Sequence, residues 1–199
     1  MQRWPASVGA EPGQIPDLPE GRPRSATATV LSIPGVETYT LVGAGIAANR
    51  LYHEPFYVTT PITIDQMVID VTVAGAGGTR ARLGVYTADK DWQPVNLVLD
   101  AGTVPVDAVA LQTLAVTQNF STGRYLKVLV SDGAPALRHV TGGSRYMGFN
   151  PVLGANAYVT QLYRAFAYAT LPSPPSPWDT IVYASTGFLH KIFFQVNSP

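Results

Sequence analysis

Apolar residues recur at about every second position over much of residues 51–132, which is the period of a β-strand with one buried face. In residues 61–74 this alternation slips by one step between Ile64 and Met67. Such a slip predicts a β-bulge. Residues 78–87 alternate again, and the glycine-rich residues 75–78 predict a turn that joins the two stretches as neighbouring antiparallel strands.

Further strand candidates follow at regular short intervals, and no helix of useful length is predicted between them. Pro55 marks residues 49–58 as an edge or bulged strand, and residues 158–169 are assigned to a strand on β-propensity. We expect a turn between residues 96–100 and 102–106. The pattern predicts an all-β fold, an antiparallel jelly-roll-like β-sandwich. The remaining predicted strands are 38–42, 112–120, 124–131, 180–183 and 190–196.

Residues 1–37 differ from the rest because proline and glycine interrupt them repeatedly. Prolines at this density block helices and central strands, so we expect an extended N-terminal arm. A disordered tail is the alternative. Spaced apolar residues favour an attachment arm that orders against another subunit; the anchors are Trp4, Ile15, Leu18, Leu31 and Ile33.

The β-sandwich domain is expected to span residues 38–199. For residues 146–199 the pattern leaves two alternatives, completion of the same sandwich or a separate small lobe. Completion is favoured because the apolar last strand, 190–196, needs a partner sheet.

Composition narrows the function. The hydrophobic fraction is 46% and the charged fraction only 13%, which predicts that other subunits cover part of the surface. Thirteen basic residues balance thirteen acidic ones, so nucleic acid is not an expected partner. The sequence shows neither the pattern of a secretory signal nor an apolar run long enough for a membrane helix, and we expect no membrane insertion.

Catalytic and metal-binding patterns are scarce. The chain has no cysteine, and His53, His139 and His190 have no ligand-type spacing, so they are interpreted as surface or packed residues. Most aspartates fall at turns, where they usually bond to their own backbone. Asp65 and Asp70 share one strand without a convincing partner for acid–base chemistry. We therefore predict a protein that is not an enzyme and needs no metal or cofactor.

Aromatic residues are more informative. Trp92 lies in a polar loop with Asp89, Asp91 and Gln93, and Trp178 ends a proline-rich loop. Exposed tryptophan beside carboxylate and amide groups suits the stacking and hydrogen bonding that a sugar requires. The same residue types suit a protein–protein contact, and incidental packing is a third interpretation. These five residues are the candidate ligand or host contacts.

Five segments in this order resemble a β-sandwich domain of tailed-bacteriophage virion proteins, especially tail fibres, spikes and proteins of phage-like gene transfer particles. The resemblance covers roughly residues 50–132, and Lys127 departs from it because an aromatic or small residue is common there. The segments are LYHEPFYV (51–58), ITIDQM (62–67), ARLGVYT (81–87), LVLDAGT (97–103) and GRYLKVLVSD (123–132).

The resemblance implies a virion structural protein that is assembled in the host cytoplasm and released by lysis. It implies a fibre or spike component that contacts the host surface, with polysaccharide as the expected receptor. It also implies attachment to other virion proteins through the arm and a homo-oligomer, with a trimer favoured. The alternative is a purely architectural role as a head-decoration protein or a fibre or tail connector. A carbohydrate-active enzyme is a third, disfavoured class.

Overall fold

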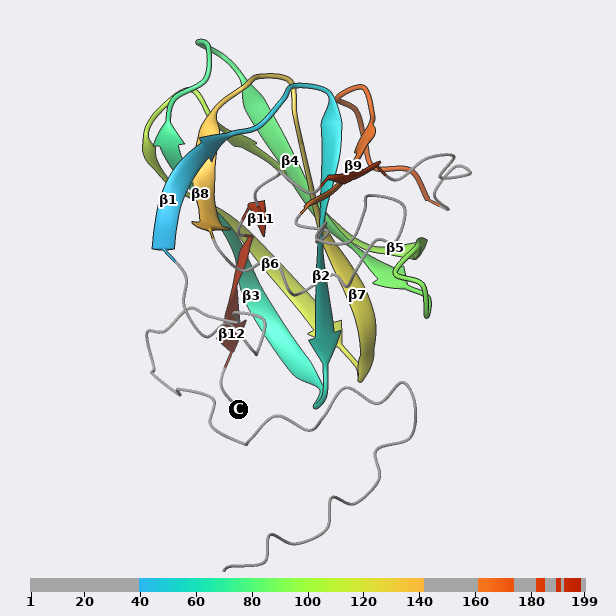
Figure 1. Cartoon of the computed structure of the whole chain (residues 1–199). Helices are drawn as coiled ribbons and strands as arrows, with labels where there is room; N and C mark the ends of the chain where they lie inside the picture. The colour runs from blue at the N-terminus through green and yellow to red at the C-terminus, as the bar shows by residue number, and fades with distance from the viewer. Residues whose placement is uncertain (1–39, 142–160, 174–181, 185–188, 191, 198–199) are drawn as a thin grey trace, which may run out of the picture.

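The protein folds into two antiparallel β-sheets that pack face to face (Figure 1). The computed structural model describes residues 40–141, 161–173, 182–184, 189–190 and 192–197. Within these ranges there is no helix. The strands are β1 (Thr40–Gly45), β2 (Arg50–Val58), β3 (Ile62–Val73), β4 (Arg80–Ala88), β5 (Pro94–Pro105), β6 (Ala110–Phe120), β7 (Gly123–Ser131), β8 (Ala136–Thr141), β9 (Gln161–Ala165), β10 (Val182–Ala184), β11 (Leu189–His190) and β12 (Phe193–Asn197).

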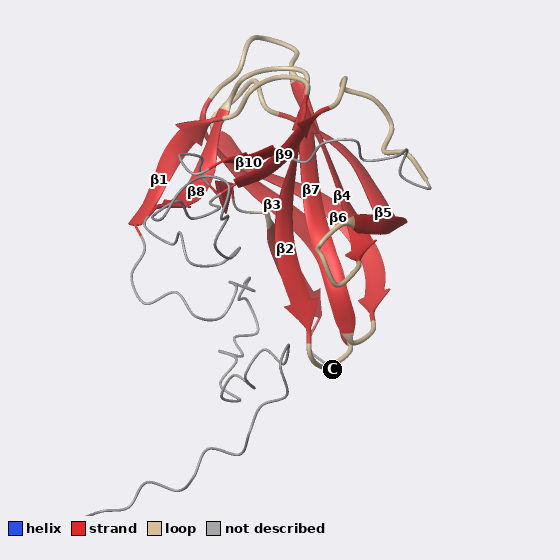
Figure 2. Cartoon of the chain, turned by 45° about the vertical axis from the view of Figure 1, so that its right-hand side comes forward, coloured by secondary structure: helices blue, strands red, loops and turns tan. Residues whose placement is uncertain are grey.

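The first eight strands have the order of a jelly roll. β1, β8, β3 and β6 lie side by side in the first sheet, and β2, β7, β4 and β5 lie side by side in the second. The chain therefore crosses between sheets at most of its connections, which lie at the two ends of the sandwich (Figure 2). Two four-stranded sheets connected in this way define the jelly roll, so the predicted fold class is confirmed.

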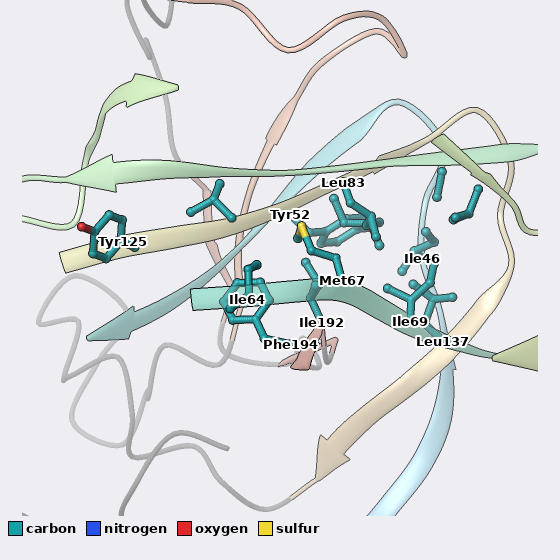
Figure 3. Packing of buried hydrophobic residues seen from close by; sticks show 14 of the residues in the cluster. Ile46, Tyr52, Ile64, Met67, Ile69, Leu83, Tyr125, Leu137, Ile192 and Phe194 are labelled. Atoms are coloured by element: carbon teal, nitrogen blue, oxygen red, sulfur yellow. The ribbon is translucent and has the colours of Figure 1, made fainter. Parts of the chain in front are cut away.

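The core lies between the sheets and is built from the inward-facing positions of their strands. Ile64, Met67 and Ile69 of β3 are fully buried against Leu83 of β4 and Tyr125 of β7 (Figure 3). Each of these side chains contributes about 1.5–3 kcal/mol by leaving water. The phase slip seen in the sequence is a bulge: Gln195 pairs with Gln66 but Val196 pairs with Ile64, so Asp65 has no counterpart in β12. The predicted bulge is confirmed.

A second apolar cluster covers the outer face of the second sheet. It contains the positions of β7 that alternate with the inward ones, Leu126, Val128 and Val130. Residues 166–173, which follow β9, cover part of this face through Phe166 and Leu171. A hydrogen bond fixes this segment to the sheet: the Tyr86 hydroxyl donates to the carbonyl of Pro172 at 2.9 Å. β7 is therefore buried on both faces.

Three predictions about strand pairing are wrong. β3 and β4 are not neighbours, because the glycine turn at 75–78 carries the chain from the first sheet to the second. Residues 96–106 contain no turn; β5 runs through as one strand, with Gly102 at φ 96° and Ala101 bulged out of the pairing with β4. β2 is not an edge strand over residues 51–53, which pair with both β7 and β9.

The physical reasons are local. Glycine turns permit a reversal but do not decide whether the next strand pairs with the last or crosses the sandwich. Glycine also allows the positive φ of a bulge inside a strand. Within the described residues, β9 pairs with residues 50–53 of β2, short of Pro55, which has no N–H to donate.

A buried ion pair lies inside the sandwich. Glu54 of β2 and Lys127 of β7 are cross-strand partners, their charged atoms are 2.9 Å apart, and both side chains are 2% exposed. The pair also contacts Ile192, the residue before β12. Lys127, the residue that departs from the phage virion pattern, is thus an inward-facing cation with a carboxylate partner beside it.

The later strands join the same two sheets. β9 pairs with β2 and β10 with β9 in the second sheet, while β11 and β12 pair with β8 and β3 in the first. The predicted arm at residues 1–37, with its anchors, and Trp178 lie outside the described residues.

Candidate functional site

The tip between β4 and β5 is a tight turn organised by Asp89. One carboxylate oxygen of Asp89 accepts the N–H groups of Asp91 and Gln93, each at 2.8 Å. The backbone closes the turn through hydrogen bonds between Asp89 and Trp92 and between Asp89 and Gln93. Trp92 adopts φ 59°, a left-handed conformation that costs energy for a bulky residue and persists only where its surroundings hold it.

The Trp92 ring packs against the outer apolar cluster of the second sheet and is half-buried. The guanidinium carbon of Arg124, at the start of β7, lies 5.9 Å from the ring centroid. That distance is within the range of a cation–π interaction. Trp92 is therefore less exposed than its place at a polar loop tip suggests, and it is fixed from two sides.

Tyr57 extends this surface along the second sheet. It is the register partner of Arg124, and it is 43% exposed. Tyr57 and Arg124 occupy the strand positions that alternate with inward-facing Phe56 and Tyr125, so they lie on the outer face with Trp92. We call Tyr57, Trp92 and Arg124, with Asp91 and Gln93 at the rim, the Trp92 face.

Asp91 adds a negative charge to this rim. Its carboxylate lies 2.7 Å from the ammonium of Lys90, and both side chains are largely exposed, at 63% and 80%. A pair this open contributes little to stability, which leaves both charges accessible to a ligand. The Trp92 face therefore combines two aromatic rings, a guanidinium, a carboxylate and an amide.

The structure brings four of the five predicted contact residues together: Asp89, Asp91, Trp92 and Gln93. Asp89 is committed to the turn itself, and Trp178 lies outside the described part of the chain. Sequence reasoning missed Tyr57 and Arg124. Their alternation with buried neighbours places them on an outer face, but only the jelly-roll order brings that end of β2 and β7 next to the β4–β5 tip.

Four other aspartates in the described part of the chain hold structure. Asp107 accepts the N–H of Gly78 at 2.8 Å, and Asp132 accepts the N–H of Arg80 at 2.7 Å. Asp100 binds the guanidinium of Arg82 with both oxygens. Asp70 forms an ion pair with Arg138 at 2.8 Å. These contacts are those of turns and cross-strand pairs.

The histidines that the structure describes in side-chain detail are packed residues. His53 and His139 are 2% and 1% exposed. Burial, with a smaller contribution from the charge of Arg164, lowers the pKa of His53 to about 3. His53 is therefore neutral at ordinary pH. Across the described ranges, no three histidine, aspartate or glutamate side chains come together as a metal site would require.

The described strands and loops contain no helix with the length and apolar character needed to cross a membrane. Comparisons of the chain with family models, with curated proteins and with solved structures found no match. The functional argument therefore depends on the residues of the chain and their arrangement.

Proposed function

We propose that this chain is a non-enzymatic structural protein of a phage or phage-like particle, and that the Trp92 face contacts host surface polysaccharide. The observation that carries the contact is the Trp92 ring, held between the apolar cluster and Arg124 beside exposed Tyr57. Jelly rolls serve as capsid and lectin domains, which supports the virion class by analogy of fold alone.

The chemistry of the Trp92 face matches a polyhydroxylated ligand. The apolar C–H face of a sugar ring stacks on an aromatic ring, and the exposed Tyr57 ring offers such a surface. Hydroxyl groups both donate and accept, so they pair with the donors of Arg124 and the oxygens of Asp91 and Gln93. Because Trp92 and Arg124 hold each other, little side-chain freedom is lost when a ligand binds.

The test is binding of the purified chain to an array of bacterial surface polysaccharides, followed by titration of the best binder. We expect Tyr57→Ala and Arg124→Ala each to weaken binding about tenfold, or about 1.4 kcal/mol. Tyr57 belongs to neither buried cluster, so its loss leaves the core intact. Arg124→Lys keeps the positive charge but removes the planar guanidinium, so its binding shows which of the two the ligand requires.

Leu111→Ala is the matched control, because Leu111 is 67% exposed on β6 of the other sheet. Its binding should equal that of the wild type. Unchanged binding in Tyr57→Ala, Trp92→Ala and Arg124→Ala, all folded by circular dichroism, would remove the Trp92 face from the proposal. Hydrolysis of the polysaccharide would contradict the non-enzymatic assignment.

A purely architectural role is the second candidate, and exposed apolar side chains at one end of the sandwich favour it. Val73, Val109 and Leu111 are 59%, 66% and 67% exposed. Leu111 pairs with Asp70, which places Leu111 and Val109 near the end of β3 that carries Val73. Exposed apolar groups of this size mark contacts with other proteins. Under this alternative, neither the wild type nor Leu111→Glu would bind polysaccharide. Leu111→Glu would in addition fail to be incorporated into particles.

A further inference from the structure

The last two strands fill a gap in the first sheet. β3 and β8 pair with each other directly only near one end, at Val71–Leu137 and Val73–Ala136. Beyond that point β11 pairs with β8 and β12 pairs with residues 63–68 of β3, so the last strands lie between them (Figure 1). We call the space that β11 and β12 occupy the strand slot.

The slot opens into the main core. Ile192 and Phe194 are 3% and 1% exposed and point among the core side chains (Figure 3). The Phe194 ring is stacked on Phe120 with centroids 5.9 Å apart and meets Phe56 edge-on at 5.2 Å. Without an occupant, the slot would expose the rings of Phe56 and Phe120 and one hydrogen-bonding edge of β3 to water.

The floor of the slot recognises main chain. The carboxylate of Glu54 accepts the N–H of Ile192 at 3.0 Å, and the ammonium of Lys127 donates to the carbonyl of the same residue at 2.6 Å. Lys127 also lies 5.2 Å from the Phe194 ring centroid. Two opposite buried charges thus bind both backbone polar groups of one residue, Ile192, and any extended strand in that position would present the same two groups.

Few residues connect β10 to β11. β10 belongs to the second sheet and β11 to the first, and only residues 185–188 separate them. A short connection to an element that completes another sheet favours exchange of that element between copies, because the same contacts form with either chain.

We propose that the strand slot is an acceptor site for β11 and β12 of a second copy of this chain, so that copies associate by exchanging their last strands. The Glu54–Lys127 pair is the recognition element, and Phe194 is the side chain that anchors the incoming strand. The exchange adds no new type of contact. It replaces an intrachain β3–β12 ladder with an identical interchain one.

Engineered cysteines test the exchange cleanly, because the natural chain has none. Gln66 of β3 and Gln195 of β12 are register partners. A Gln66→Cys chain and an affinity-tagged Gln195→Cys chain are mixed, unfolded together in urea, refolded at high concentration and oxidised. We expect a disulfide-linked pair of one tagged and one untagged chain, identified by mass after non-reducing electrophoresis.

Three controls set the baseline. The chain carrying both substitutions should form the bond within itself, and each single-cysteine chain alone reports chance collisions. Leu111→Cys, exposed on β6, replaces Gln66→Cys as a mismatched partner and should give only the chance level. A yield of the disulfide-linked mixed pair that exceeds the chance level at least severalfold supports exchange. A yield that does not exceed the chance level overturns the proposal.

Discussion

Gly84 of β4 lies directly beneath Leu171 of the segment that covers the second sheet. A Cβ atom built on Gly84 would overlap Cδ1 of Leu171 and would lie 2.7 Å from the carbonyl oxygen of Leu99. Leu171 is 3% exposed and belongs to the outer apolar cluster. The absence of a side chain at this one position of β4 therefore allows residues 166–173 to lie flat on the sheet.

Gly84→Ala should destabilise the fold, because neither the buried leucine nor the strand backbone can withdraw without disturbing its neighbours. Overpacking of this kind costs about 1–3 kcal/mol, measured as a lower urea midpoint. Gly77→Ala is the matched control, since a Cβ there meets nothing within 4 Å, and its midpoint should change little. Equal midpoints for the two variants would contradict the close contact.

Lys127→Met should be strongly destabilising, because it leaves the Glu54 carboxylate buried beside an apolar side chain. Removing one partner of a buried ion pair costs about 3–5 kcal/mol. Glu54→Leu combined with Lys127→Met removes both charges, and this double variant should recover part of the lost free energy of unfolding. The recovery is partial because the N–H and the carbonyl of Ile192 lose their partners. The measurement is urea denaturation of the three chains, and a double variant less stable than Lys127→Met would refute the pairing.

His53 should make stability depend on pH. Its pKa falls from 6.5 to about 3 on folding, because burial, assisted by Arg164, disfavours the charged form. As the pH drops below 6.5, the unfolded chain binds a proton at His53, whereas the folded chain does not. The contribution of neutral His53 to the free energy of unfolding is therefore fully present above pH 6.5. It is lost between pH 6.5 and 3, at about 1.4 kcal/mol per pH unit.

The pH effect is measured as the difference between wild type and His53→Leu in urea denaturation at pH 6.5, 5.5 and 4.5. The other titratable groups are common to both chains and cancel in this difference. Relative to the variant, the wild type should lose stability at each step. Parallel curves would show that His53 is not held neutral in the folded protein.

The N-terminal arm, residues 1–37, is predicted to be an assembly element, and light scattering tests this. The full chain should form a discrete oligomer, whereas a chain beginning at residue 38 should be a monomer. The variant Trp4→Ala with Ile15→Ala keeps the length of the arm and removes two anchors, so it tests the anchors alone. The same number of subunits in all three chains would identify the arm as a tail without an assembly role.

Much of the fold follows from period-two alternation, because a strand with one face in the core must alternate. The bulge at Asp65 is visible in the same way, since a slip in the apolar phase is the bulge itself. Pairing is harder to predict, because β3 and β4 are adjacent in sequence yet lie in different sheets. Local turn residues carry no information about which long-range partner a strand will find.

The candidate site shows the same division. Trp92 and its acidic neighbours stand together in sequence and are found as a unit. Arg124 lies over the Trp92 ring, with Tyr57 beside it on β2, only because of the strand order β2–β7–β4–β5, which no local pattern encodes. Lys127 could not be placed from the sequence, because alternation with apolar Leu126 and Val128 separates two faces without saying which one points inward. The assembled sandwich places Lys127 inside, beside its partner Glu54 and in contact with Ile192.

The place of β12 also sets the order in which this chain matures during synthesis. β3 is synthesised early, but one of its edges and the aromatic centre of the core are completed only by β12, whose last residue is Asn197. The first sheet cannot close until that residue has left the ribosome.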